Sequence, residues 1–293
     1  MMLLTPGMAA FDMDGTLLNE ASQMSKGNRE ALFKLQETGC KLVLSTGRMF
    51  GSAQIPIDSF PFDGYVCSNG AALYEKDGTL IRRYSLAKEM VIGAIHALRQ
   101  DSEPVYYEMH DTNSNRWMVQ EDRDRLEPII EQGTSLEGVS MRRFALYRLA
   151  KVAPLEEMLK NIEKGEAEIV KFFIWESDAK RLKWIADQFA PWKSQISITS
   201  SGSTNIEINS HGVSKWEGLQ HFCQLWGIAP EKVMAFGDAE NDREALTEAG
   251  YSVAMENASS KIKEIAKFVA PHHNEDGVAQ FIWKHVLGET PSR

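Results

Sequence analysis

The stretch 11–18, of sequence FDMDGTLL, constrains most strongly what this chain can fold into. It places Asp12 and Asp14 two residues apart, directly after the apolar run 8–11, and follows them with a glycine and a hydroxyl residue. Alternate residues of a β-strand point to the same side, so both carboxylates are expected to emerge together where the strand ends. Open α/β sheets bind ligands at that edge. An ordinary Asp-Gly turn is the simpler alternative, but the full D-x-D-G-T pattern is much rarer than such a turn.

Short apolar runs alternate with helices at both ends of the 293-residue chain. Strands are expected at 8–11, 41–46, 64–69, 232–238, 251–255 and 268–271, with a hairpin at 73–81. Helices are expected at 25–38, 214–226, 239–249, 259–266 and 278–287. Apolar strands that alternate with helices form parallel sheets covered on both faces. The pattern predicts a doubly wound α/β core made of residues 1–83 and 210–293.

The segment 84–209 has a different pattern, in which helices are interleaved with half-buried strands. Helices are expected at 87–100, 122–132, 154–164 and 178–189, and strands near 105–109, 117–119, 139–149 and 168–175. A last antiparallel pair is expected around Gly202. This predicts an inserted α+β domain that has one sheet with helices on one face.

The composition excludes several classes of protein. A net charge of −9 argues against a nucleic-acid-binding protein, which would carry a basic face, and requires that an anionic substrate be attracted locally. Three cysteines without a C-x-x-C pair indicate a reducing compartment and no zinc site. No apolar run is long enough to span a bilayer, and the N-terminus lacks the features of a signal peptide. We therefore expect a cytoplasmic protein with no membrane partner.

Two further strands end in residues suited to binding a phosphate or a metal ion. The stretch 44–48, LSTGR, offers the Thr46 hydroxyl and the Gly47 amide as a small anion cradle, although hydroxyl residues before glycine usually only turn a chain. The stretch 236–242, FGDAEND, adds Asp238 and a second aspartate. Carboxylates at strand ends suit Mg²⁺, which binds through a few carboxylates and the substrate phosphate. The simpler role for the first of these aspartates is a helix N-cap.

Two basic residues near these motifs have different expected roles. Lys215 begins the helix with which the chain re-enters the first domain. A single lysine is nearly always a solvated surface charge, but this position makes Lys215 a candidate for holding a phosphate. Arg48 follows the anion cradle and is expected to be structural, in a salt bridge to a nearby acid.

Taken together, these motifs resemble those of the haloacid dehalogenase superfamily, and most closely its Cof-type branch of phosphatases, which carry an α+β cap of type IIB. Three more stretches look like that branch: 68–71 (SNGA), 212–215 (GVSK) and 276–279 (DGVA). The resemblance covers essentially the whole chain and implies that the inserted domain is the cap. Two positions depart from the pattern, because Trp216 replaces a usual glycine and Arg243 replaces a usual apolar residue.

The resemblance also implies roles for individual residues. Asp12 would be the nucleophile that forms an aspartyl-phosphate, and Asp14 would protonate the leaving oxygen and then activate water. Mg²⁺ would be held by Asp12, by the backbone carbonyl of Asp14 and by Asp238, with Asp242 orienting these ligands. The phosphoryl oxygens would be held by Met13, Thr46, Gly47, Lys215 and Asn241.

The leading hypothesis is a Mg²⁺-dependent phosphatase of small phosphorylated metabolites, such as sugar phosphates. The alternatives are a phosphotransferase or mutase with the same intermediate, and a non-catalytic regulator that binds a phosphorylated ligand. Substrate choice is expected to lie in the cap, where the candidates are Tyr107, Arg116, Trp117, Lys171 and Asn205, although such residues are more often core or solvated surface. A zinc hydrolase and a P-loop enzyme are disfavoured, since HExxH and GxxxxGK[ST] are absent.

Overall fold

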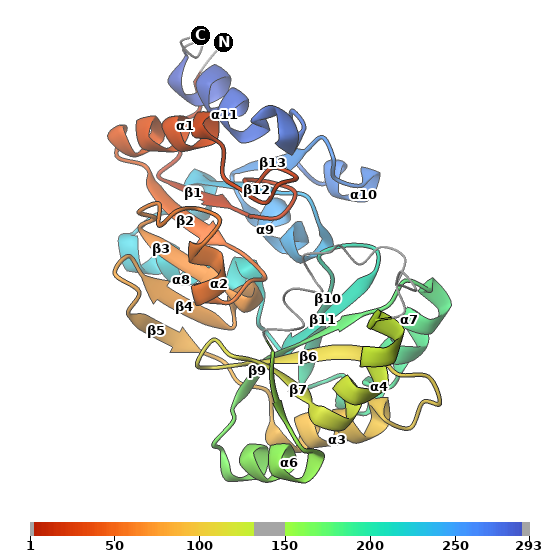
Figure 1. Ribbon diagram of the computed structural model, residues 1–293. Helices are drawn as coiled ribbons and strands as arrows, with labels where there is room; N and C mark the ends of the chain where they lie inside the picture. The colour runs from red at the N-terminus through yellow and green to blue at the C-terminus, as the bar shows by residue number, and fades with distance from the viewer. Residues whose placement is uncertain (1–2, 132–149, 289–293) are drawn as a thin grey trace. The chain divides into compact units, whose positions relative to one another are not determined.

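A computed structural model describes residues 3–131 and 150–288 of the chain (Figure 1). The strand expected at 139–149 lies outside the described residues. The chain divides into two compact units, of which the first comprises Met1–Arg82 and Ser214–Arg293 and the second comprises Arg83–Val213. Among the described residues, no helix combines the length and apolar character needed to cross a membrane.

The first unit is built on an eight-stranded sheet whose order is β14-β13-β12-β1-β2-β3-β4-β5. Its strands are β1 (Met8–Phe11), β2 (Lys41–Ser45), β3 (Gly64–Cys67), β4 (Ala72–Glu75), β5 (Leu80–Arg83), β12 (Val233–Gly237), β13 (Tyr251–Met255) and β14 (Phe268–Ala270). The strands from β14 to β3 are parallel, and β4 turns back antiparallel to β3. The predicted parallel core is therefore confirmed.

Helices cover both faces of this sheet (Figure 1). They are α1 (Lys26–Glu37), α2 (Phe50–Gln54), α8 (Lys215–Trp226), α9 (Arg243–Glu248), α10 (Ser260–Lys263) and α11 (Gly277–Ile282), which continues as a π-helical turn over Trp283–Leu287. The alternation of β1 decides which helices it meets: Ala9 and Phe11 pack in one apolar cluster with α1 and α11, whereas Met8 and Ala10 pack in another with α8 and α9. Both faces of β1 are thus buried, as its uninterrupted apolar sequence predicts.

The second unit has a six-stranded sheet of order β10-β11-β9-β6-β7-β8. Its strands are β6 (Tyr106–Asp111), β7 (Arg116–Val119), β8 (Lys151–Ala153), β9 (Ile169–Trp175), β10 (Ile196–Thr199) and β11 (Asn205–Ser210), and its helices are α3 (Lys88–Leu98), α4 (Gln120–Glu131), α6 (Leu155–Lys164) and α7 (Ala179–Asp187). All neighbouring strands are antiparallel except β7 and β8. The expected α+β insert is confirmed, with β8 as a strand that the sequence did not predict.

The two faces of this second sheet differ in polarity. One face is apolar and packs against α3, α6 and α7, with Phe172 and Ile174 of β9 as representative core residues. The opposite face carries buried charges that are paired with one another. The Lys171 amine donates to Glu207 at 2.8 Å, and Glu108 pairs with both Arg116 and His110. Buried charges are tolerated because each has such a partner.

In this network the pKa values of both His110 and Glu108 are lowered. Burial lowers the pKa of His110 to about 4, which leaves the imidazole neutral. Burial alone would raise the pKa of Glu108, but the hydrogen bond from His110 and the charge of Arg116 outweigh it and lower the pKa to about 2. Glu108 is therefore ionised and His110 neutral near pH 7.

We expect the contribution of His110 to the stability of the folded chain to fall as the pH drops from about 6.5 towards 4. In this window His110 stays neutral in the folded state, whereas in the unfolded chain it takes up a proton near its reference pKa of about 6.5. At His110 the unfolded state binds more protons, so this residue's contribution to the free energy of unfolding rises with pH across the window. The expected loss on acidification is on the order of 2 kcal/mol.

Urea unfolding at about pH 7 and about pH 5, followed by circular dichroism, measures this loss. His110→Gln is expected to unfold more easily at both pH values but to lose less between them. An equal loss in the variant and the unmodified protein would show that His110 is not the titrating group.

Candidate active site

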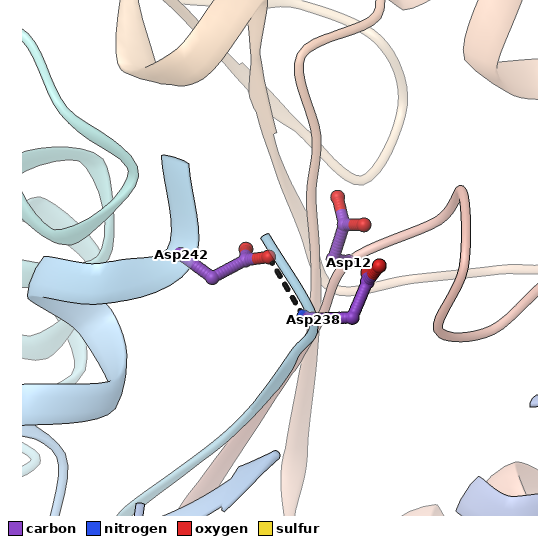
Figure 2. A group of neighbouring side chains, drawn as sticks. All are labelled: Asp12, Asp238 and Asp242. Atoms are coloured by element: carbon purple, nitrogen blue, oxygen red, sulfur yellow. Dashed lines mark hydrogen bonds between the residues drawn. The ribbon is translucent and has the colours of Figure 1, made fainter. Parts of the chain in front are cut away.

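The order β12-β1-β2 brings three strand ends together at the carboxyl edge of the parallel sheet. Phe11 is in register with Phe236 of β12 and with Leu44 of β2, and the Asp12 amide donates to the Phe236 carbonyl at 3.1 Å. The residues that follow these strands are therefore neighbours, although they are far apart in the sequence. Asp12, Asp238 and Asp242 each place a carboxylate oxygen within 4.8 Å of the others (Figure 2).

Lys215 provides the positive charge of this cluster. Its amine donates to Asp12 Oδ1 and to Asp242 Oδ1, both at 2.6 Å, and its side chain is only 1% exposed. The surface role that is usual for a lysine is therefore wrong for Lys215. Its helix, α8, starts against the turn after β3, where a Cβ on Gly70 would clash with the Ser214 carbonyl. Close backbone approach at Gly70 thus lets α8 deliver the amine to the carboxylates.

Asp242 fixes the loop after β12 in place. Its Oδ2 accepts hydrogen bonds from the amides of Asp238 at 3.0 Å and of Ala239 at 3.1 Å, and the first of these is drawn in Figure 2. Its other oxygen is taken by the lysine amine. With both oxygens engaged by the protein, Asp242 is suited to orienting Asp238.

Asp238 is held by residues of two loops. The Thr16 hydroxyl donates to its Oδ1 at 2.9 Å, and the Asn257 amide lies 3.4 Å from its Oδ2. Gly15 has a φ of +83° and leaves no room for a Cβ, which would clash with the Asp238 carboxylate. The glycine and the hydroxyl of the D-x-D-G-T motif therefore both serve to seat this third aspartate.

The carboxylates of the cluster are costly to ionise without a cation. Burial raises the pKa of Asp12 well above its usual range, and the charges of Asp242 and Asp238 add to this shift while Lys215 opposes it. Burial, together with the charge of Asp242, raises the pKa of Asp238 to about 7. Burial alone would lower the pKa of Lys215, but the two aspartates outweigh it and raise the pKa. One lysine thus leaves the cluster short of positive charge.

Asp14 does not lie in this cluster. Strand β1 ends at Phe11, so strand alternation alone does not place Asp14, and the expected common direction of the two carboxylates stays a prediction. The Asp14 carboxylate is 54% exposed and turns to Arg48, which contacts both of its oxygens, with Nε at 2.7 Å from Oδ2. The expected salt bridge of Arg48 to a nearby acid is therefore confirmed.

The residues expected to bind the phosphate lie on the same carboxyl edge of the sheet, where they are connected to one another through hydrogen bonds of the loops. Thr46 is buried, and its hydroxyl accepts from the Arg48 amide at 3.1 Å. The Asn241 amide donates to Asn69 Oδ1 at 3.2 Å, and the Asn69 backbone amide donates to the Thr46 carbonyl at 3.0 Å. Asn241 Oδ1 is buried without a hydrogen-bond partner. Met13 has its side chain in the core, so only its backbone is available to a ligand.

Sequence reasoning missed Asn69 and Asn257 as site residues. Asn69 has a φ of +61° in the 3₁₀ turn after β3, where it joins Asn241 to the loop after β2. Asn257 follows β13 and donates to the Gly15 carbonyl at 2.8 Å. Both follow strands that end on the same edge of the sheet, and this placement is the signal that could have found them.

The five candidates in the second unit all have partners within that unit. Tyr107 hydrogen-bonds to Asp122 at 2.5 Å, Trp117 donates to Asp111, and Asn205 accepts from Ser201. Arg116 and Lys171 form the ion pairs described above, and Lys171 is buried rather than a solvated surface charge.

The two residues that depart from the family pattern, Trp216 and Arg243, have roles in packing and in a surface ion pair. Trp216 is buried in the apolar cluster on the α8 side of the sheet, so its indole is part of the core. Arg243 pairs with Glu240 on the surface.

Comparison with known proteins places this fold and site in a family. Residues 9–282 match the family described as haloacid dehalogenase-like hydrolase. Phosphatase YwpJ of Bacillus subtilis (strain 168) is 28% identical over 290 residues, which cover 96% of this chain and 99% of that protein. The 5-amino-6-(5-phospho-D-ribitylamino)uracil phosphatase YwtE of the same organism is 27% identical over 288 residues, covering 96% of this chain and 98% of that protein.

A solved structure agrees with these sequence matches. A haloacid dehalogenase-like hydrolase from B. subtilis superimposes with a TM-score of 0.77 at 27% identity, and the match covers 95% of this chain and 99% of that one. The largely antiparallel sheet of the second unit forms the cap of this fold. The chain therefore belongs to the haloacid dehalogenase superfamily, as a phosphatase of its Cof-type branch.

Proposed function

We propose that this phosphatase hydrolyses small phosphorylated metabolites with Mg²⁺, through an aspartyl-phosphate on Asp12. The observation that carries the proposal is the buried cluster in which Lys215 bridges Asp12 and Asp242 beside Asp238. The cluster has three carboxylates and only one amine, so it can accept a further cation such as Mg²⁺. The negatively charged phosphoryl group needs positive charge around it, which the metal ion and the Lys215 amine would supply together.

The donor set fits Mg²⁺. It offers only hard oxygen atoms, and the carboxylates of Asp12 and Asp238 converge within 4.8 Å. We assign the metal to Asp12, to the backbone carbonyl of Asp14 and to Asp238, with Asp242 orienting Asp238 through its two backbone contacts. Bound there, Mg²⁺ would neutralise phosphoryl charge and keep Asp12 ionised.

Asp12 is the proposed nucleophile because it is buried, fixed and free to present one oxygen. Its Oδ1 accepts a hydrogen bond from the Lys215 amine, and we assign the attack on phosphorus to its other oxygen. In the first step this carboxylate forms a bond to phosphorus while the bond from phosphorus to the ester oxygen breaks. The electron pair stays on the ester oxygen, which takes a proton from Asp14 and leaves as an alcohol.

The second step returns Asp12 to its starting state. Asp14, now a carboxylate, takes a proton from water, and the water oxygen forms a bond to phosphorus as the bond to Asp12 breaks. Its exposed position outside the cluster suits a group that must reach both the leaving alcohol and water. The products are the alcohol and inorganic phosphate.

The phosphoryl oxygens have several candidate donors. We assign them to the Lys215 amine, the Thr46 hydroxyl, the Gly47 amide, the Met13 backbone amide and the Asn241 side chain. The unpartnered Oδ1 of the buried Asn241 amide supports this, because a buried polar group without a partner is costly until a ligand or water satisfies it.

The names of the relatives support a proposal for the substrate class. YwtE is named for a phosphorylated ribityl compound, which supports a phosphorylated sugar or polyol as substrate here. We assign the inserted segment, at about 84–209, the role of setting specificity. A mutase with the same intermediate would convert a sugar phosphate into its isomer and release no phosphate.

Asp12→Asn is expected to lower kcat by on the order of 10⁴-fold or more, because an amide cannot attack phosphorus at a useful rate. The fold should persist, because the amide keeps the shape of the carboxylate and Lys215 keeps its second partner, Asp242. Asp58→Asn, at a fully exposed aspartate of the same unit, is the matched control and should keep its activity. Turnover by the Asp12 variant within tenfold of the unmodified protein would rule out covalent catalysis.

Phosphate release from a panel of phosphorylated sugars, polyols and nucleotides, with Mg²⁺ and with EDTA, tests the reaction itself. We expect release that EDTA abolishes and added Mg²⁺ restores. Full activity in EDTA contradicts the metal assignment. Sugar isomers without free phosphate would identify a mutase, and no turnover of any compound would favour a regulator.

Asp238→Asn is expected to stabilise the metal-free protein at about pH 8. The pKa of Asp238 is about 7 in the folded state and about 3.9 in an unfolded chain, so the folded state binds more protons between these values. At Asp238 the contribution to the free energy of unfolding of the metal-free protein therefore falls as the pH rises through this window, by on the order of 4 kcal/mol and opposite in sign to the contribution of His110. Thermal unfolding with and without Mg²⁺ measures this: the unmodified protein should gain stability from Mg²⁺, and the variant should gain little. A variant that Mg²⁺ stabilises equally would remove Asp238 from the metal site.

A further inference from the structure

Arg48 holds Asp14 in a geometry that a surface salt bridge does not need. Its guanidinium contacts both oxygens of the carboxylate, with Nε at 2.7 Å from Oδ2 and NH2 at Oδ1. The two partners come from different loops at the same edge of the sheet, after β1 and after β2. The Arg48 side chain is 19% exposed, whereas that of Asp14 is 54% exposed. The more buried partner therefore fixes the more exposed one.

The backbone of Arg48 is fixed as well. Its amide donates to the Thr46 hydroxyl at 3.1 Å, and its carbonyl accepts from the Ser68 amide at 2.9 Å. The guanidinium thus extends from a loop that is anchored to the turn after β3. An exposed ion pair contributes only about 0–1 kcal/mol to stability, so folding alone gives little reason for so constrained an arrangement.

Two parallel hydrogen bonds define the plane of a carboxylate as well as its position. An ionised carboxylate has about four lone-pair sites, so an arginine that occupies two of them leaves others open to a further partner. The pair therefore orients Asp14 without blocking proton transfer. Without Arg48, an exposed aspartate side chain would sample several rotamers.

We propose that Arg48 is a positioning residue, which holds the Asp14 carboxylate in the orientation needed to pass a proton to the leaving alcohol and to take one from water. This inference rests on the proposed function, in which Asp14 carries that proton. It assigns Arg48 no contact with the substrate. Its effect is exerted only through Asp14.

The leaving group separates this role from a purely structural one. Ribitol 5-phosphate releases an alkoxide that has to be protonated, whereas p-nitrophenyl phosphate releases a phenolate that is stable without a proton. Arg48→Met removes both hydrogen bonds at similar side-chain length. We expect it to lower kcat on ribitol 5-phosphate by about 10- to 100-fold, a part of the usual contribution of a general acid, and kcat on p-nitrophenyl phosphate by less than about 3-fold. KM should change little for either substrate.

Three further variants distinguish a positioning role of Arg48 from a purely structural one. Arg48→Lys, which keeps the charge but not the paired donors, should fall between Arg48→Met and the unmodified protein on ribitol 5-phosphate. In an Asp14→Asn background, Arg48→Met should cause no further loss, because the two residues act as one unit. Arg243→Met breaks another arginine–carboxylate pair of the same unit and should keep full activity.

Several results would overturn the inference. These are equal losses on the two substrates, a large rise in KM, an additional loss in the Asp14→Asn background, or faster turnover by Arg48→Met. If the unmodified protein releases no phosphate from either ester or from any compound of the panel above, the proposed function fails, and the role of Arg48 fails with it. A crystal structure of Arg48→Met should show a rotated or disordered Asp14 side chain with Lys215 still bridging Asp12 and Asp242. An Asp14 side chain that keeps its place without Arg48 contradicts the proposal whatever the activity.

Discussion

The amine of Lys215, buried between two aspartates, is the interaction on which the rest of the site depends. Two hydrogen bonds of 2.6 Å hold Asp12 and Asp242 on either side of it. Removing one partner from a buried ion pair typically costs about 3–5 kcal/mol, because the remaining charge has no solvent. Asp242 in turn holds the backbone of Asp238. The lysine therefore fixes Asp12, the proposed nucleophile, directly, and it fixes Asp238 through Asp242.

The parallel sheet makes this arrangement possible. Strands β12, β1 and β2 are adjacent, so residues more than two hundred positions apart meet at one edge. Helix α8 must then begin close to the turn after β3, and the small residue at Gly70 permits that approach. The cluster that results is poorer in positive charge than in carboxylates, as the raised pKa values of Asp12 and Asp238 indicate. This imbalance suits a site that gains a cation and a phosphate only during its working cycle.

Most of the fold was predictable from the sequence because its signals are local. Short apolar runs indicated the strands of the parallel core and, between them, most of its helices. Strand β8, at Lys151–Ala153, was missed because its sequence, KVA, has no apolar run longer than two residues, whereas the equally short β14 is apolar throughout. The sequence also did not identify Asp14 as the acid that pairs with Arg48. Its pairing with Arg48 depends on tertiary contact between two loops. Asn69 and Asn257 were missed for a related reason, since an asparagine in a loop carries no pattern of its own and gains a role only from its neighbours.

The central claim is that Asp12 accepts the phosphoryl group, and trapping that intermediate tests it most directly. Protein mixed with Mg²⁺ and ribitol 5-phosphate is quenched in acid within the first turnover and digested, and its peptides are analysed by mass spectrometry. The account predicts one added phosphoryl group on the peptide that contains Asp12, located at that side chain. Rapid phosphate release with this peptide unmodified at every quench time would contradict it and indicate direct attack by water.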